Sequence, residues 1–119
     1  MKRVLVVEDN ATNLYLMRFI LQKNGYEVIE ARDGLIAVKL AKEEKPDLIL
    51  MDIQLPILDG YEATRKIRAM EETKDIPIIA LTSFAMVGDK EKALNAGCTG
   101  YLEKPINPET FIMEIEKYL

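Results

Sequence analysis

Short apolar runs recur along the chain, and between them lie longer segments whose apolar residues repeat with helical spacing. The short runs predict strands and the periodic segments predict helices. The predicted strands span Arg3–Val7, Glu27–Ala31, Asp47–Met51, Ile78–Leu81 and Gly100–Leu102. The predicted helices span Thr12–Asn24, Leu35–Glu44, Tyr61–Glu72, Val87–Asn95 and Pro108–Leu119. Strands that alternate with helices of this length indicate an α/β domain with a parallel sheet covered on both faces. The second strand has charged ends, which are typical of an edge, whereas the middle strands are apolar throughout.

Residues at the ends of the predicted helices support these boundaries. Asp33 and Asp59 precede the second and third helices, where each side chain can serve as an N-cap. Asn107 and the proline after it are typical of a cap followed by the first helical residue. Gly25 and Gly97 stand where glycine commonly ends a helix. We therefore expect helices with defined ends and short connections.

The first predicted helix carries apolar residues on two faces. At about 100° per residue, one face is expected to pack on the core. It comprises Asn13, Leu16, Met17, Ile20, Leu21 and Asn24. Tyr15 and Phe19 fall together on another face, one turn apart. Two aromatic residues off the core face are typical either of a docking patch or of isolated surface apolar residues.

Polar residues stand at the ends of four predicted strands. They are Glu8-Asp9, Asp52, Thr82 and Lys104. The carboxyl ends of parallel strands lie along one edge of a sheet, so we expect these side chains to meet there. Three neighbouring carboxylates raise one another's pKa unless a cation is present. The cluster therefore favours a hard divalent metal, and a carboxylate beside it can accept a phosphoryl group.

The composition narrows the class of protein. A chain of 119 residues, 49% hydrophobic and 30% charged, is expected to form one globular domain, 1–119, without an attached output domain. No apolar run approaches the roughly 20 residues that span a bilayer, and the apolar run near the N-terminus is too short for a signal peptide. We therefore expect a cytoplasmic location and no membrane partner. The net charge is -4, and Lys and Arg alternate with Glu, so we expect no nucleic-acid partner.

Histidine and cysteine usage excludes several kinds of site. The chain has no His, which excludes a His-containing catalytic triad, a His-liganded zinc site and a phosphohistidine on this chain. A phosphohistidine that takes part in the chemistry must then belong to a partner. The single Cys98 cannot form an internal disulfide, and we expect it to be a small buried packing residue.

The strand-end motifs resemble those of the receiver domains of two-component response regulators. The resemblance covers the whole chain and rests on motifs in matching order: Val6–Asn10, Leu50–Pro56, Asp59-Gly60, Ala80–Thr82 and Gly100–Pro105. It implies a flavodoxin-like, doubly wound sheet of five parallel strands in the order 2-1-3-4-5.

The resemblance also implies a role for each acid. Asp52 corresponds to the phosphoacceptor, and Glu8 and Asp9 correspond to the acidic pair that holds Mg²⁺. The expected direct ligands are Asp9, Asp52 and the backbone carbonyl of Gln54, with Glu8 acting mainly through water. Mg²⁺ prefers six oxygen ligands and keeps several waters.

The remaining motif residues resemble those that hold and report the phosphoryl group. Lys104 is expected to reach a phosphoryl oxygen, and to pair with Asp52 before phosphorylation. The peptide bond to Pro105 corresponds to a cis bond in the family. Thr82 is expected to donate its hydroxyl to the phosphoryl group, and Tyr101 to fill the space that this movement vacates. Phosphorylation would then reshape the face formed by the fourth helix, the fifth strand and the fifth helix.

The implied function is that of a phosphorylation-activated signalling switch. The phosphoryl group would come from the phosphohistidine of a histidine kinase or a histidine-phosphotransfer protein, which docks near the first helix, where Tyr15 and Phe19 lie. The switch would act on a downstream protein target as a monomer, and its only catalysis would be its own phosphorylation and dephosphorylation. Gln54 and Phe84 occupy positions that tune the phosphorylated lifetime in this family. We hypothesise that Phe84 lengthens that lifetime by hindering the hydrolytic water.

Several alternatives remain at the level of sequence. The motifs resemble both the receivers of hybrid sensor kinases and stand-alone cell-cycle regulators. A phosphatase of the haloacid-dehalogenase type also uses Asp and Mg²⁺, but its nucleophile follows the first strand in an Asp-x-Asp pattern. A flavodoxin-like cofactor binder has a Ser-, Thr- and Gly-rich phosphate loop where this chain has acids. An unphosphorylated receiver-like scaffold is the third alternative.

Overall fold

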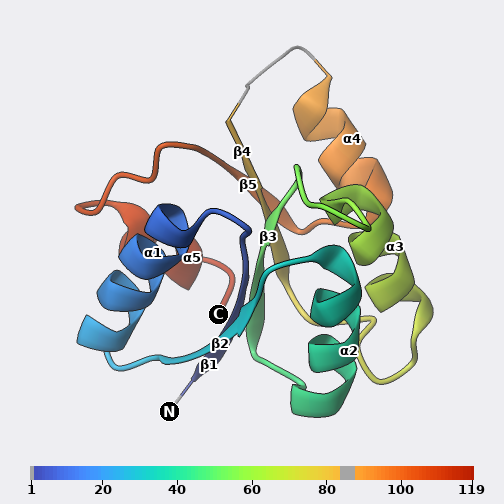
Figure 1. Cartoon of the computed structure of the whole chain (residues 1–119), viewed down its shortest axis with the longest axis horizontal. Coiled ribbons are helices and arrows are strands. Elements are labelled where there is room, and N and C mark those ends of the chain that lie inside the picture. Colours follow the sequence, from blue (N-terminus) through green and yellow to red (C-terminus); the bar gives the residue numbers. More distant parts are fainter. Residues whose placement is uncertain (1, 84–87) are drawn as a thin grey trace.

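The structure is a computed structural model that describes residues 2–83 and 88–119. The strands are β1 (Arg3–Val7), β2 (Glu27–Ala31), β3 (Leu48–Asp52), β4 (Ile78–Thr82) and β5 (Gly100–Glu103). The helices are α1 (Ala11–Lys23), α2 (Gly34–Glu44), α3 (Gly60–Ala69), α4 (Asp89–Ala96) and α5 (Phe111–Glu116). The strands form one parallel sheet in the order β2-β1-β3-β4-β5, which confirms the expected fold and the edge position of β2 (Figure 1).

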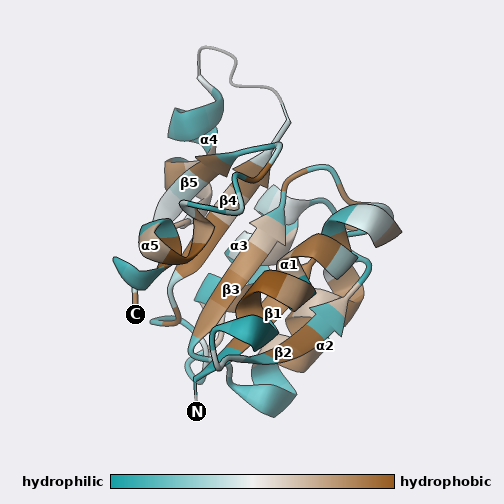
Figure 2. Cartoon of the chain, turned by 90° about the vertical axis from the view of Figure 1, so that its left-hand side faces the viewer, coloured by the Kyte–Doolittle hydropathy of each residue, from teal (hydrophilic) through white to brown (hydrophobic). Residues whose placement is uncertain are grey.

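Helices cover both faces of this sheet. α1 and α5 lie on one side, and α2, α3 and α4 lie on the other (Figure 1). Figure 2 shows hydrophobic residues along the central strands, whereas the helices carry both hydrophobic and hydrophilic residues. This layering explains why β1, β3 and β4 have apolar residues on both faces, since each face is covered by helices.

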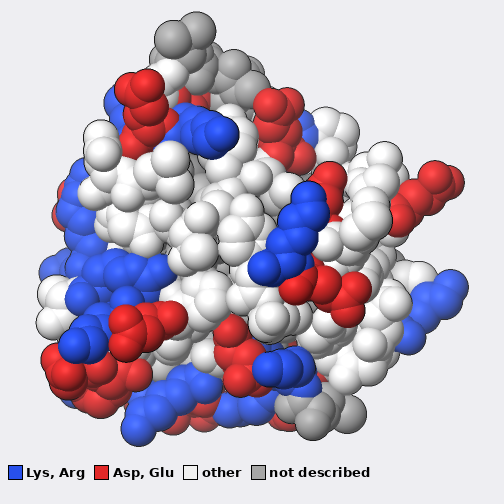
Figure 3. Space-filling view, turned by 180° about the vertical axis from the view of Figure 1, so that it is seen from behind, with Lys and Arg blue, Asp and Glu red and all other residues white. Residues whose placement is uncertain are grey.

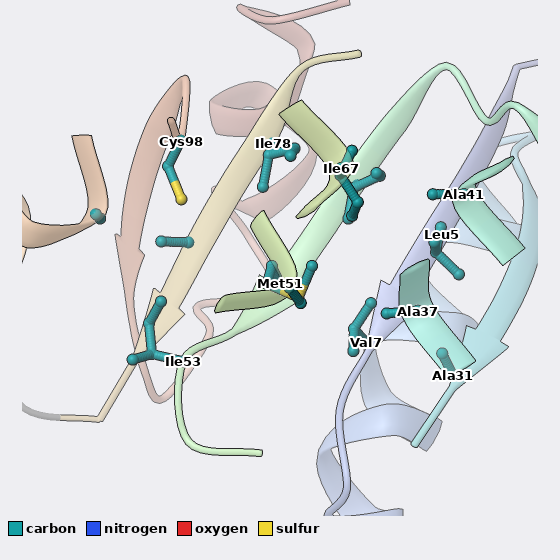
Figure 4. Close-up of a cluster of buried hydrophobic side chains, with 14 residues drawn as sticks. Leu5, Val7, Ala31, Ala37, Ala41, Met51, Ile53, Ile67, Ile78 and Cys98 are labelled. Atoms are coloured by element: carbon teal, nitrogen blue, oxygen red, sulfur yellow. The ribbon is translucent and has the colours of Figure 1, made fainter. Parts of the chain in front are cut away.

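Each face of the sheet has its own apolar core, because successive strand residues point to opposite faces. On the side of α2, α3 and α4, Leu5 and Met51 pack with alanines of the helices and with Ile67 (Figure 4). On the side of α1 and α5, Val6 and Leu50 pack with Phe111 and the apolar face of α1. Cys98 belongs to the first core and is 5% exposed, so its expected packing role is confirmed.

The helix caps agree with the sequence in several places. The Asp33 side chain accepts a hydrogen bond from the Ile36 amide at 2.8 Å, and the Asp59 side chain accepts one from the Glu62 amide at 3.0 Å. Gly97 adopts a φ of 112° at the end of α4, in the left-handed region that favours glycine.

The predicted core face of α1 is wrong at both of its ends. Leu14 is 2% exposed and packs in the core, whereas Asn24 is exposed and donates from its side chain to the Ile20 carbonyl at 2.8 Å. The helix also starts one residue earlier than predicted, because Asn10 caps it by accepting from the Asn13 amide at 2.9 Å. Asn13 lies in the first turn of the helix, and its side chain contacts Glu8 at the edge of the sheet.

Two helices are shorter than predicted, for local reasons. α3 ends at Ala69 instead of Glu72, because the buried Thr73 hydroxyl donates to the Ile67 carbonyl at 2.6 Å and folds the chain back. α5 starts at Phe111 instead of Pro108. Asn107 accepts from the Glu109 amide at 3.0 Å and organises a turn ahead of the helix.

The start of the fourth predicted helix and one predicted lifetime position cannot be compared with the structure. Val87 and Phe84 lie outside the described residues. Within residues 2–83 and 88–119, no helix combines the length and the apolar character needed to cross a bilayer.

Candidate functional site

The parallel register brings the ends of four strands to one edge of the sheet. Val7 pairs with Met51, Asp52 with Leu81, and Thr82 with Glu103. The polar residues at or just after these strand ends therefore lie beside one another, as the sequence predicted. Glu8, Asp52 and Thr82 are buried, at 0%, 4% and 6% exposure, whereas Asp9 is exposed.

Lys104 follows β5 and joins the buried acids. Its Nζ lies 2.9 Å from Glu8 Oε1, 2.7 Å from Glu8 Oε2 and 3.1 Å from Asp52 Oδ2. The expected pair with Asp52 is confirmed, and the peptide bond from Lys104 to Pro105 is cis. The bidentate contact with Glu8 was not predicted. Asn13, which was predicted to lie on the core face of the first helix, donates from Nδ2 to Glu8 Oε1 at 2.9 Å.

Asp52 lies in surroundings that oppose its ionisation. Its pKa is raised from 3.8 to about 7, mainly by burial and then by the neighbouring Glu8 carboxylate. The Lys104 ammonium acts in the opposite direction and only partly offsets these effects. The Gln54 amide donates to Asp52 Oδ1 at 3.1 Å, which fixes the carboxylate against the start of the following loop.

The three acids could hold a metal ion together. One carboxylate oxygen from each of Glu8, Asp9 and Asp52 lies within 4.8 Å of the other two. Two ligands of one Mg²⁺ ion, each at 2.0–2.1 Å, lie at most roughly 4.2 Å apart, so a small side-chain movement would suffice. The donor set contains only oxygen, as this hard cation prefers. The residues therefore fit Mg²⁺.

Thr82 and Tyr101 come from neighbouring strands at this edge. The Thr82 carbonyl accepts from the Lys104 amide at 2.7 Å, which links the end of β4 to the start of the lysine-bearing segment. Tyr101 is half-buried and packs against the core shared with α3 and α4. Burial raises the pKa of the Tyr101 hydroxyl, with smaller contributions from Glu103 and Asp89.

The outer face of α1 carries an aromatic patch, and α1 begins next to the acidic edge formed by Glu8, Asp9, Asp52 and Lys104. Tyr15 and Phe19 are 59% and 54% exposed, and their rings stack with centroids 6.4 Å apart. The Arg18 guanidinium lies 5.6 Å from the centre of the Tyr15 ring, within range of a cation–π contact. Between α1 and the segment after β5 is a cavity of about 40 Å³, whose lining includes Leu16 and Lys104. The helix that carries the patch therefore shares a cavity with Lys104, although Tyr15 and Phe19 do not line it.

A parallel sheet of this strand order, with buried acids and a lysine at its carboxyl edge, defines a receiver-type signalling domain. The chain belongs to the response regulator receiver domain family, whose model matches residues 4–116. It is therefore a receiver domain of two-component signalling, a switch and not an enzyme in the usual sense.

Relatives and solved structures agree with this assignment. The chain is 49% identical over 118 residues to the polar-differentiation response regulator DivK of Brucella ovis, covering 99% of this chain and 96% of DivK. The receiver domain of the sensor histidine kinase PA1611 from Pseudomonas aeruginosa, solved with a magnesium ion in its active-site cleft, is 43% identical. Its TM-score is 0.91, with 98% of this chain and 96% of that chain covered. The receiver domain of Saccharomyces cerevisiae Ssk1, solved with the histidine phosphotransfer protein Ypd1, is 36% identical. Its TM-score is 0.91, and the match covers 98% of this chain and 88% of the Ssk1 receiver chain.

Proposed function

We propose that this receiver domain accepts a phosphoryl group on Asp52 from a partner's phosphohistidine and then signals through protein contacts. The observation that carries the proposal is the meeting of Asp52, Glu8 and Lys104 at one buried edge, although they come from three different strand ends. A buried carboxylate with a raised pKa and a single cationic partner is typical of a reactive site.

Mg²⁺ is the metal we assign to the acidic edge. Asp9 and Asp52, with the Gln54 backbone carbonyl, would supply direct ligands. Glu8 would act mainly through water, because its two oxygens already accept hydrogen bonds from Lys104 and Asn13. When bound, the ion would offset the negative charge of the acids and of the phosphoryl oxygens.

In the proposed reaction, an Asp52 carboxylate oxygen forms a bond to phosphorus while the phosphorus–nitrogen bond of the phosphohistidine breaks. The electron pair of that bond stays on the partner's imidazole, which takes up a proton, and Asp52 carries an acyl phosphate. Lys104 would leave Glu8 and Asp52 to contact a phosphoryl oxygen as a point charge. Positioning and charge stabilisation supply most of the catalysis in such transfers.

The phosphorylated state would be read out through β4 and β5. The Thr82 hydroxyl would turn to a phosphoryl oxygen, and Tyr101, which is only half-buried, would move into the space left behind. The resulting change lies on the face of α4, β5 and α5, where a downstream protein would bind.

The aromatic patch of Tyr15 and Phe19 is the surface we assign to the phosphodonor protein. Its support is the exposure of two stacked rings on α1, the helix whose Asn13 and Leu16 line a cavity together with Lys104. Clustered aromatic residues are typical of the centres of protein interfaces. A donor seated there would place its phosphohistidine near the acidic edge.

Transfer from a phosphorylated histidine-phosphotransfer protein tests this function. The partner should lose its label and this chain should gain it, in the presence of Mg²⁺ and not with an excess of chelator. Replacing both patch residues, Tyr15→Ala with Phe19→Ala, should slow this transfer at least about tenfold, because aromatic anchors carry much of an interface's affinity. A matched pair of exposed apolar replacements elsewhere, Leu94→Ala with Met113→Ala, should leave it unchanged.

Labelling by a small phosphodonor separates docking from chemistry in the same experiment. The Tyr15 and Phe19 variant should be labelled by acetyl phosphate as fast as the wild type. Loss of both reactions would contradict a docking role. The absence of label from either donor in the wild type would instead favour the unphosphorylated scaffold.

A further inference from the structure

A second cleft lies between α3 and α4, and its lining includes none of Glu8, Asp9, Asp52 and Lys104. It has a volume of about 370 Å³, which is within the range of small-molecule sites. From the α3 side it is lined by Asp59, Tyr61 and Arg65, and from the α4 side by Lys92 and Asn95. Neighbours three or four residues apart share one face of a helix, so Tyr61 with Arg65 and Lys92 with Asn95 form two facing rows.

Hydrogen bonds join α3 to the end of α4 and the residues after it, at one end of this cleft. Arg68, one turn beyond Arg65, donates from Nε to the Gly97 carbonyl at 2.8 Å and from Nη2 to Thr99 Oγ1 at 3.2 Å. A Cβ on Gly97 would lie 2.7 Å from Arg68 Cγ, so the contact is close. The separation of the helices is therefore set by a packed contact, and the cleft is part of the folded structure.

The lining of the cleft combines two basic side chains, one acid, one aromatic ring and one amide. Arg65 and Lys92 are cationic, although Arg65 also pairs with Glu62 on its own helix. Lys92 forms no ion pair with an acid among residues 2–83 and 88–119. The Asp59 carboxylate already accepts the hydrogen bond that caps α3. Figure 3 shows basic side chains on the side of the molecule that carries α3, with acidic side chains next to them.

We propose that the cleft between α3 and α4 binds a small phosphorylated ligand with a planar heterocycle, of the class and size of a purine nucleoside monophosphate. Arg65 and Lys92 would hold the phosphate, since guanidinium and ammonium groups make charge-assisted hydrogen bonds to it. Tyr61 would stack on the ring, and Asn95 offers both a donor and an acceptor to the ring's edge.

The position of Tyr61 gives such a ligand a route to the switch. Burial is the main reason that the pKa of Tyr61 is raised, and the Asp89 carboxylate adds to this rise. Tyr61 and Tyr101 pack against the same core. A ligand on Tyr61 would therefore act on the core against which Tyr101, the residue to which the proposed function assigns the change of state, also packs.

Amide chemical shifts during titration with GMP, without Mg²⁺, test the proposal. GMP should give saturable shifts at Tyr61, Arg65, Lys92 and Asn95. The double variant Arg65→Ala with Lys92→Ala should weaken binding at least about tenfold, because two charged contacts to phosphate are lost. The matched control is Lys66→Ala with Lys90→Ala, which removes the same charge from exposed positions outside the cleft on the same helices. It should weaken binding less than about twofold.

Fragments of the probe separate the two halves of the site. Guanosine and ribose 5-phosphate should each bind at least about tenfold more weakly than GMP, since each lacks one anchor. The proposal is overturned if GMP gives no saturable shifts, if the shifts centre on Lys104, or if the control variant loses as much affinity. Equal binding of ribose 5-phosphate and GMP would likewise overturn it, because the ring would then have no place on Tyr61.

Discussion

The acids of the acidic edge should make the metal-free protein less stable than a variant that lacks one of them. Glu8, Asp9 and Asp52 bring three carboxylates together, and within the described residues Lys104 is the cation that contacts them. Replacing Asp52 by Asn removes one negative charge and keeps the shape of the side chain. Its carbonyl oxygen can still accept the hydrogen bond from the Gln54 amide. We therefore expect Asp52→Asn to stabilise the fold.

The magnitude follows from the pKa of Asp52. It rises from 3.8 to about 7 on folding, so the folded protein binds this proton more tightly than the unfolded chain. The contribution of the Asp52 carboxyl to the free energy of unfolding is fully present below pH 3.8 and is lost as the pH rises through about 7. At about 1.4 kcal/mol for each pKa unit, the loss is at most roughly 4 kcal/mol. The pKa of about 7 already includes the favourable contact with Lys104, so we expect Asp52→Asn to raise the stability by about 2–4 kcal/mol at pH 8.

Urea denaturation with chelator at pH 8 and at pH 4.5 measures this effect. The gain from Asp52→Asn should be present at pH 8 and nearly absent at pH 4.5, where the wild-type carboxyl is protonated. Adding Mg²⁺ at pH 8 should stabilise the wild type and not the variant, because binding to the folded state raises its stability. Glu43→Gln, which removes an exposed acid on α2, should change stability by less than about 0.5 kcal/mol at either pH. A variant no more stable than the wild type at pH 8 would refute the reasoning, as would an equal gain at pH 4.5.

Three further predictions concern the lysine, the β3–α3 loop and the core. Lys104→Met leaves the buried acids without their cation and should cost about 3 kcal/mol without metal, part of it recovered in Mg²⁺; equal stability without metal would contradict this. Gly34→Ala should cost roughly 2–3 kcal/mol, because its Cβ would lie 1.9 Å from the Leu58 carbonyl oxygen; an unchanged urea midpoint would contradict the close approach. Phe111→Ala, at 1% exposure, should cost about 3–5 kcal/mol, whereas Met113→Ala, at 62% exposure, should cost less than about 0.5; similar losses would count against the assigned core.

The strands and the active edge could be predicted because the signals for them are local. A run such as Leu48–Met51 is apolar at every position, which is typical of a strand buried on both faces. The parallel topology then aligns the ends of such strands, so Asp52 and Lys104 could be placed together without coordinates. Asp33 and Asp59 cap their helices through contacts only a few residues long, and they too could be predicted.

The features that could not be predicted depend on contacts between distant residues. Lys104 contacts Glu8 across 96 positions of sequence, and only the folded geometry decides how it divides its hydrogen bonds between Glu8 and Asp52. The early end of α3 has a different cause: Glu71 and Glu72 are good helix formers, but the buried Thr73 hydroxyl donates to the Ile67 carbonyl and ends the helix before them. The cleft between α3 and α4 has no sequence signature at all, because the packing of the two helices creates it.

Intact mass after incubation with acetyl phosphate and Mg²⁺ tests the central assignment most directly. The wild type should gain one phosphoryl group, and the gain should disappear in Asp52→Asn and in the presence of chelator. Asp59→Asn, which alters an acid that caps α3 nearby, should still be labelled. Absence of the gain in the wild type, or its persistence in Asp52→Asn, would contradict the assignment of Asp52 as the phosphoacceptor.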